Sequence, residues 1–471
     1  MSRPMIEREN ALRLGATVDS CFSEGHFSTG IHHLDSLRSP HSKPSPLHMS
    51  ELVYIALHPP PPIVVSRPLM ASPQKLQDRQ KAQVIPPVKA TQEALDLLQA
   101  YCRTNDPASL MQGLPCHPLT QEKPKPLNED DYDSDFKRQA SIAFNAKDCW
   151  AWLAAGFITK ADGSEYSDDE DFESNGDPQS RAVGKYAWGV FEWLLNMWEK
   201  DEALNEASTG DKYSPLLLQQ VPAPRTGTGL RWDVTVPLNV LFSCYSEGVN
   251  TNEIAKQIDF ENRSMLSSRL LSLLVNLASA SMILDTQLLQ LACVHLTKLS
   301  PARLFTFLSL ISHQHLNFKI ALCSYYITSF MGKPSQTASA AARPNPRARP
   351  TAASRRAQDI PSESQPAPST TGPKTMPFAL PSPSDFIKLL DIPPPREPEP
   401  YLRSQHFRYH LISAYVMLYK RKRRSNHPSM DILDYAQLRT RIDDLFGPQN
   451  SDRQDREELG ALHSTLLTMI A

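Results

Sequence analysis

Apolar residues recur at three- and four-residue spacing through most of the stretch from Val236 to Phe330, which is the spacing of one face of an α-helix. The pattern predicts helices over residues 237–247, 251–259, 262–281, 285–298, 301–314 and 316–331. Short connections between them favour a stack of antiparallel helices. The clearest sets are Leu266, Leu270, Leu273, Leu274 and Leu277; Leu288, Leu291, Ala292 and His295; and Leu304, Phe307, Leu308 and Ile311.

Two more helices are predicted upstream, over residues 141–157 and 185–200. The second has apolar stripes on two faces, and its only polar stripe is Lys185, Glu192 and Glu199. This pattern is typical of a helix that lies between other helices with one edge in water. Five of the six tryptophans fall between Trp150 and Trp198, and we expect them in the core, with a partner-binding groove as the alternative.

These helices share no sequence repeat at a fixed period. We therefore expect an all-α protein whose main domain, residues 141–331, is an irregular helical bundle or a solenoid-like stack. Within it, residues 160–180 are dense in Asp and Glu and read as a solvated acidic insertion.

Segments rich in proline interrupt the helical pattern, and the chain has 41 prolines against 17 glycines. Residues 1–88, rich in Pro, Ser and His, are predicted to be a disordered arm, and residues 332–383 a disordered linker. Residues 89–140 are predicted to hold a docking helix that starts at Thr91, followed by an acidic linker.

A small helical module is predicted over residues 384–471. Its helices are expected at 385–390, where Ser384 would cap the first turn, and at 401–422 and 430–446. A final amphipathic helix carries Leu459, Leu462, Leu466 and Met469 on one face. We expect this module to dock on the main domain or to bind a partner.

Charge and cysteine content narrow the class of protein. The net charge of −2 excludes no partner, because runs of opposite sign cancel in the sum. The seven cysteines are scattered singly, which disfavours a disulfide-stapled secreted protein. The first ten residues carry charges where a signal peptide needs an apolar run, and no apolar run is long enough to span a membrane.

The most specific local signal is a run of five consecutive cations, hereafter the basic tract: Lys420, Arg421, Lys422, Arg423 and Arg424. Such a tract is typical of a nuclear import signal or a nucleic-acid contact. The structural alternative is a helix end whose cations complement the helix dipole. A second basic stretch lies at residues 343–356, with Arg343, Arg347, Arg349, Arg355 and Arg356.

Sequence patterns for other chemistry are weak. A helix-turn-helix drawn over 251–258 and 263–276 would offer only Arg263 and Arg269 to DNA, and Asp259 stands where the turn favours glycine, so an ordinary helical hairpin is expected. No phosphate-binding loop or nucleophile elbow occurs. Of the paired metal-ligand residues, only His406 and His410 have the spacing of one helix face. No acidic third ligand is expected near them, so we expect a pair on the helix surface and neither a metal nor another cofactor.

Two serines lie in kinase-like contexts, and the chain is expected to be a phosphoprotein. Ser167 precedes acidic residues, and Ser141 follows Lys137 and Arg138 at an expected helix start, where a phosphate would meet the amide end of the helix.

Together these features predict a non-enzymatic scaffold or adaptor subunit that binds protein partners in a nuclear assembly, with the cytoplasm as the alternative compartment. The alternative function is nucleic-acid binding through the runs 343–356 and 420–424.

Overall fold

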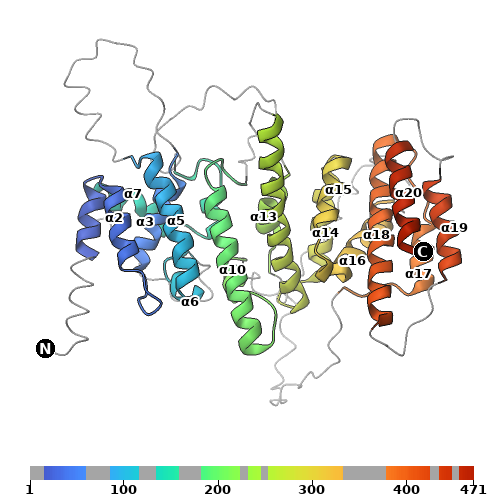
Figure 1. Cartoon of the computed structure of the whole chain (residues 1–471), viewed down its shortest axis with the longest axis horizontal. Helices are drawn as coiled ribbons and strands as arrows, with labels where there is room; N and C mark the ends of the chain where they lie inside the picture. The colour runs from blue at the N-terminus through green and yellow to red at the C-terminus, as the bar shows by residue number, and fades with distance from the viewer. Residues whose placement is uncertain are drawn as a thin grey trace, which may run out of the picture. The chain divides into compact units, whose positions relative to one another are not determined.

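The computed structural model describes residues 15–59, 85–115, 134–158, 182–222, 232–245, 253–331, 378–424, 434–447 and 456–470. Every regular element in these ranges is helical, which confirms the predicted all-α class (Figure 1). The predicted acidic insertion 160–180 and most of the predicted linker 332–383 lie outside the described residues.

The chain divides into two compact units, residues 1–319 and 320–471. The first unit begins with a helix over residues 15–23 and ends within α16 (Leu316–Tyr326), and the second begins there. The other helices of the first unit are α2 (Phe27–Ser36), α3 (Pro46–Leu57), α5 (Val88–Thr104), α6 (Pro107–Met111), α7 (Asp135–Phe144), α8 (Cys149–Leu153), α10 (Trp188–Thr209), α11 (Pro215–Gln219), α12 (Thr235–Ser243), α13 (Glu253–Ser279), α14 (Asp285–Leu296), α15 (Pro301–Leu310) and η2 (His313–His315).

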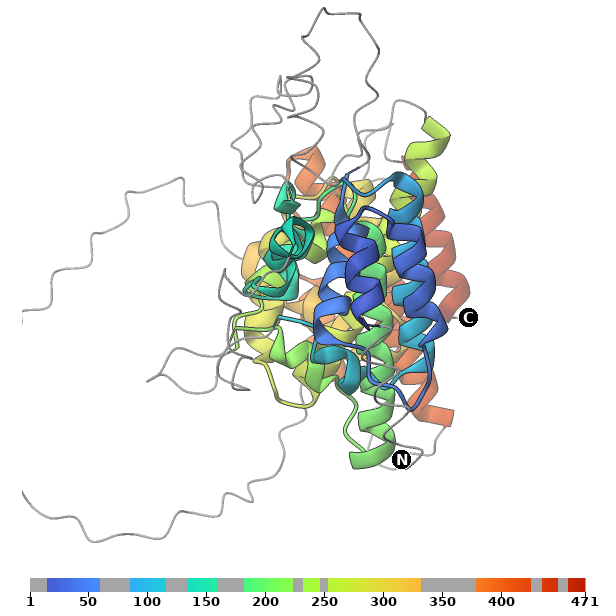
Figure 2. The same ribbon diagram turned by 90° about the vertical axis from the view of Figure 1, so that its left-hand side faces the viewer.

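Helices of the first unit pack in successive layers. α3 contacts α5 and α7, and α2 lies against α5. Figure 2 shows α7, in teal, to one side of the blue helices α2 and α3. α10 covers α3 and α5, α13 covers α10, and α14 and α15 lie against α13 (Figure 1). This order gives the first unit a solenoid-like stack of helices without a common repeat.

The predicted disorder of residues 1–88 is wrong for residues 15–59. α3 is buried along its length from Met49 to Leu57, at the centre of the first layer. Its apolar part, Leu52–Leu57, is uninterrupted because it is covered on every side, and periodicity alone does not distinguish such a short run from a strand or a linker fragment. The predicted boundaries at 88/89 and 140/141 therefore do not separate compact units, and the division falls at 319/320 instead of 331/332.

Polar side chains connect the layers around α10. Lys200 on α10 donates to the carbonyl oxygens of Cys102 and Asn105, each at 2.8 Å, where α5 ends. On the other side, Arg269 of α13 forms a forked pair with Glu199, at 2.8 and 2.6 Å. The fork fits a carboxylate at two points, so it sets the register of α10 on α13. Of the wet edge predicted for this helix, Glu192 is exposed, whereas Lys185 precedes α10 and Glu199 is covered in part by its pair with Arg269.

Four of the five clustered tryptophans lie in the core, as predicted. Trp150 and Trp198 have ring centroids 5.3 Å apart, and both side chains are buried, as are Trp152 and Trp193. Trp188 is half-buried. Rings of this size bury most apolar area per residue, which accounts for their place between the layers.

The predicted helix over 141–157 is instead two helices, α7 and α8. Ser134 accepts a hydrogen bond from the Lys137 amide at 3.2 Å and starts α7, while Asp148 accepts one from the Ala151 amide at 2.9 Å and starts α8. The apolar spacing predicted one helix here, but the two caps, Ser134 and Asp148, start two separate helices.

The helices predicted at 251–259 and 262–281 are a single helix, α13. Asp259 lies in its interior and pairs with Arg263 one turn later, at 3.1 Å. Both the helix-turn-helix and the ordinary helical hairpin expected here are therefore wrong. An ion pair at four-residue spacing supports a continuous helix. The two predicted helices had been separated just after Asp259.

The second unit is built around α18 (Pro398–Arg424), with η3 (Ile327–Met331), α17 (Pro383–Leu390), α19 (Tyr435–Phe446) and α20 (Arg456–Ile470). Stacked aromatic pairs hold it together: Phe407 lies on Tyr326 and Tyr415 lies on Phe386, with centroids 3.7 and 4.0 Å apart. Ser382, and not Ser384 as expected, caps α17 by accepting from the Asp385 amide. The predicted carboxy-terminal helices are thus present, with shifted ends.

Among the described helices, none is both long enough and apolar enough to cross a membrane.

The continuity of α13 predicts how residue 259 responds to glycine. Inside a helix, Asp259→Gly should be less stable than Asp259→Ala by about 1 kcal/mol, because glycine loses more backbone entropy. Both variants lose the pair to Arg263, so their difference isolates the backbone effect. Urea unfolding of the full chain measures it. Asp211, which follows the end of α10, is the matched control, and its Gly and Ala variants should differ little. Equal stability of the two residue-259 variants would contradict a continuous helix.

Candidate functional site

Four ionisable side chains meet in the first layer, and we call them the polar cluster: Asp19, His48, Glu51 and Lys137. His48 Nε2 lies 3.0 Å from Asp19 Oδ1, and Lys137 Nζ donates to Asp19 Oδ2 at 2.9 Å. His48 and Glu51 stand three residues apart on α3, which places them one turn apart on the same side of the helix. Asp19 comes from the helix over 15–23 and Lys137 from α7.

Aromatic packing positions these helices. The ring of Phe136 lies against Phe22, Phe27 and Tyr54, with centroid distances of 5.6, 5.3 and 5.8 Å. Phe136 therefore joins α7 to the helix over 15–23, to α2 and to α3. Because Lys137 is the next residue, the insertion of Phe136 into the core carries the ammonium to the edge of Asp19.

Glu51 is the unusual member of the cluster. Its side chain is fully buried, and neither carboxylate oxygen has a hydrogen-bond partner. Burial, reinforced by the negative charge of Asp19 and opposed by Lys137, raises the pKa of Glu51 to about 8. The carboxyl is therefore largely protonated at neutral pH, since a buried carboxylate without partners is costly.

Asp19 behaves in the opposite way. Burial by itself would raise the pKa of Asp19, but the hydrogen bonds and charges of His48 and Lys137 outweigh it, and the net pKa lies below the ordinary value. Asp19 is therefore the ionised acid of the cluster and Glu51 the neutral one.

Three members of the cluster could serve as metal ligands. Asp19, His48 and Glu51 each offer one ligand atom, and these atoms lie within 4.8 Å of one another, the only such group found within the described ranges. These three residues were not predicted as a site, because they fall in the segment expected to be disordered. The His48-x-x-Glu51 spacing was the available signal, and it is visible only once α3 is known to be a helix.

The basic tract ends α18. Tyr419 is the last buried residue of that helix, and Lys420, Arg421, Arg423 and Arg424 are exposed, with Lys422 half-buried. Lys420 Nζ donates to the carbonyl oxygen of Met469 on α20 at 2.6 Å. The cations lie where the carbonyl end of the dipole favours them, so a structural role is compatible with a binding role.

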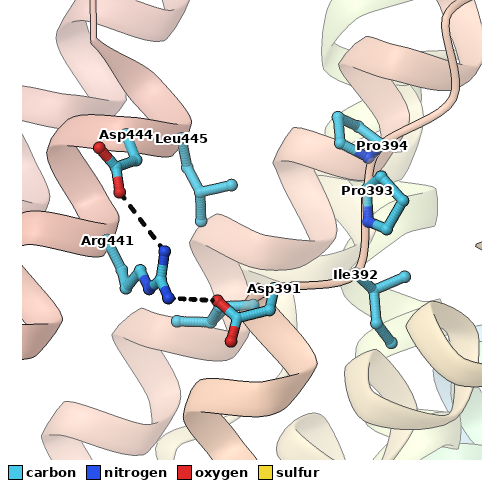
Figure 3. A pocket seen from close by; sticks show the side chains of 8 residues that line it. Asp391, Ile392, Pro393, Pro394, Arg441, Asp444 and Leu445 are labelled. Carbon is cyan, nitrogen blue, oxygen red and sulfur yellow. Dashed lines mark ion pairs between the residues drawn. The ribbon is translucent and has the colours of Figure 1, made fainter.

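An open pocket of about 390 Å³ lies between the end of α17 and α19 in the second unit (Figure 3). Arg441 spans it, pairing with Asp391 at 3.0 Å and with Asp444 at 3.6 Å. The remaining residues that line the pocket are apolar: Leu390, Ile392, Pro393, Pro394 and Leu445. The lining has no serine, cysteine or histidine, and both carboxylates are paired, so the pocket suits an apolar side chain of a ligand better than nucleophilic or general acid–base chemistry.

The other predicted site residues do not form a site with these. Ser141 lies in the last turn of α7, where its hydroxyl donates to the Arg138 carbonyl, so the expectation that it starts a helix is wrong. A phosphate there would meet the carbonyl end. Ser167 and the basic stretch 343–356 lie outside the described residues.

The spaced pair His406 and His410 is buried on α18, and not on the helix surface as expected. The expected absence of a nearby acid is also wrong, because α20 brings Glu458 Oε1 to 2.8 Å from His406 Nε2.

Comparison of the chain with protein-family models, with curated protein sequences and with solved structures found no match. The function is therefore inferred from the residues themselves.

The raised pKa of Glu51 predicts a pH-dependent stability. Between about pH 4.5, its ordinary pKa, and about pH 8, folded Glu51 keeps a proton that the unfolded chain releases, so stability falls as pH rises through this window. Glu51→Gln removes the dependence. The variant should gain roughly 1.4 kcal/mol per pH unit over the unmodified chain, approaching about 5 kcal/mol at the top of the window.

Urea unfolding in buffer containing a chelator, at several pH values across that window, measures this gain. Glu24→Gln, at an exposed acid near the same helices, is the control and should follow the unmodified chain. Parallel pH profiles for Glu51→Gln and the unmodified chain would mean that Glu51 is ionised in the folded state.

Proposed function

We propose that the protein is a non-enzymatic scaffold or adaptor subunit of a nuclear assembly. The basic tract is its contact to an acidic protein surface, and the first partner with such a surface is a nuclear import receptor. The observation that supports this proposal most is that α18 extends beyond its buried part into solvent. Beyond Tyr419 the helix continues for a further turn in which four of the five cations are exposed. An acidic partner can reach them without disturbing the core.

Exposed apolar side chains on the first unit fit a scaffold role. Ile258 and Met265 lie seven residues apart on the same side of α13, and they are 55% and 54% exposed. Large apolar side chains aligned on one helix side are the kind of surface that a partner helix covers. The layered helices behind them hold this surface rigidly, because α13 is fixed to α10 by the Arg269–Glu199 pair.

Nucleic-acid binding, the alternative, has less support. The two cations that a helix-turn-helix would have offered are engaged inside the first unit. Arg263 is buried, pairs with Asp259 and lies over the ring of Trp188 at 5.6 Å. Arg269 is held by Glu199. Neither is placed to read a base, so the basic tract would have to bind phosphates by charge alone.

Neutralising the basic tract should move the protein out of the nucleus. A variant with Arg421, Lys422, Arg423 and Arg424 replaced by Gln keeps Lys420, whose hydrogen bond joins α18 to α20. Imaging of the fluorescently tagged full chain in eukaryotic cells should show a severalfold lower ratio of nuclear to cytoplasmic signal. The matched control replaces the exposed Lys43, Lys89, Lys147 and Lys185 by Gln, which changes the net charge equally without touching the tract.

Two results would overturn the proposal. One is equal nuclear signal for both variants. The other is binding of the purified chain to duplex DNA with an affinity that falls steeply with salt, with a slope near −4 for about four phosphate contacts, and that disappears in the tract variant alone. That second result would identify a nucleic-acid-binding protein.

A further inference from the structure

We infer that Asp19, His48 and Glu51 form a binding site for one divalent first-row transition-metal ion, which links the amino-terminal helix over 15–23 to α3. The inference is independent of the proposed function, since the site lies in the first unit and the basic tract in the second.

The geometry of the three side chains carries the inference. Asp19 Oδ1 and His48 Nε2 are 3.0 Å apart, which is close to the separation of roughly 3 Å between two ligands that each lie about 2.0–2.1 Å from one ion. Glu51 supplies a third oxygen within 4.8 Å of both atoms. His48 and Glu51 share one side of α3, so that side presents both ligands to the same ion.

The burial of Glu51 without a hydrogen-bond partner is a second, independent observation. Glu51 is a fully buried carboxyl close to another acid, and neither of its oxygens is in direct contact with a hydrogen-bond donor in the cluster as it stands. A bound cation would provide a stabilising contact, and would also screen Glu51 from Asp19. Once Glu51 loses its proton, as it must to bind a metal, the buried carboxylate needs an opposite charge, and no cation forms an ion pair with it within the described residues.

Lys137 has a different role and is not a metal ligand. Its ammonium bonds Asp19 Oδ2, the oxygen that does not contact His48. Lys137 can therefore stay on Asp19 as an outer partner that orients the carboxylate, as groups behind metal ligands commonly do. Its positive charge also repels the ion. Removing this charge should strengthen metal binding, whereas removing a ligand should weaken it.

The ligand types select the ion. An imidazole together with two carboxylates suits Mn²⁺, Fe²⁺, Co²⁺ or Zn²⁺ better than Mg²⁺ or Ca²⁺, which favour oxygen alone. Three protein ligands leave coordination positions for water. Access is from the side of Asp19, whose side chain is 30% exposed, while His48 is 12% exposed and Glu51 closes the inner end.

Mn²⁺ is the probe of choice, because thiolates bind it weakly and the chain has seven cysteines that would compete for Zn²⁺. The full chain, stripped with a chelator and dialysed at slightly alkaline pH, is titrated with Mn²⁺, and free Mn²⁺ is followed by electron paramagnetic resonance. One tight site per chain is expected. Glu51→Gln and His48→Gln should each weaken it by at least about 100-fold, since each removes a ligand. Lys137→Gln should tighten it by about tenfold or more.

Glu24→Gln and His26→Gln are the matched controls. These residues form an exposed acid–histidine pair in the same part of the chain, 3.8 Å apart, and their variants should bind Mn²⁺ as the unmodified chain does. Circular dichroism checks that every variant is folded.

The inference is overturned if the unmodified chain binds no Mn²⁺ at about 1 mM, well above metal-site affinities, or if Glu51→Gln binds as tightly as the unmodified chain.

Discussion

The burial of α3 is the constraint on which the first unit depends. Nine successive residues from Met49 to Leu57 are shielded from water, so other helices must cover every side of α3. α5, α7 and α10 supply that cover, and the helix over 15–23 joins them through the rings around Phe136. An apolar helix with no wet edge is not stable alone in water, and it therefore draws residues that are distant in sequence into one layer.

The same burial produces the polar cluster. Glu51 stands immediately before the apolar run Leu52–Leu57 of α3 and is buried together with it. The cluster then separates two acids by their surroundings: Asp19 receives two polar partners and stays ionised, whereas Glu51 receives none and keeps its proton. The buried Glu51 carboxyl has no hydrogen-bond partner beside the ionised Asp19 and His48. This arrangement costs stability unless a further group binds between these side chains.

The second unit follows a different principle. α18 is buried through most of its middle, from Arg403 to Val416 with the exception of Tyr409, and beyond Tyr419 it continues into water as the basic tract. Its buried part is held by stacked rings and by the contact of His406 with Glu458, so the exposed end is a rigid extension of a packed helix. Rigid placement reduces the conformational entropy that charged side chains lose when a partner binds.

The sequence by itself determined the all-α class, the core position of four tryptophans and the exposure of Glu192 on α10, because these follow from helical periodicity within one element. It also located the basic tract, since that signal is a run of neighbouring residues. Only the tertiary structure decided that residues 46–57 are a helix, because the apolar run Leu52–Leu57 is short and has no period. It decided the continuity of α13 through the Asp259–Arg263 pair. It alone brought Lys137 to Asp19 across 118 residues, since local patterns carry no information about which distant helices share a layer.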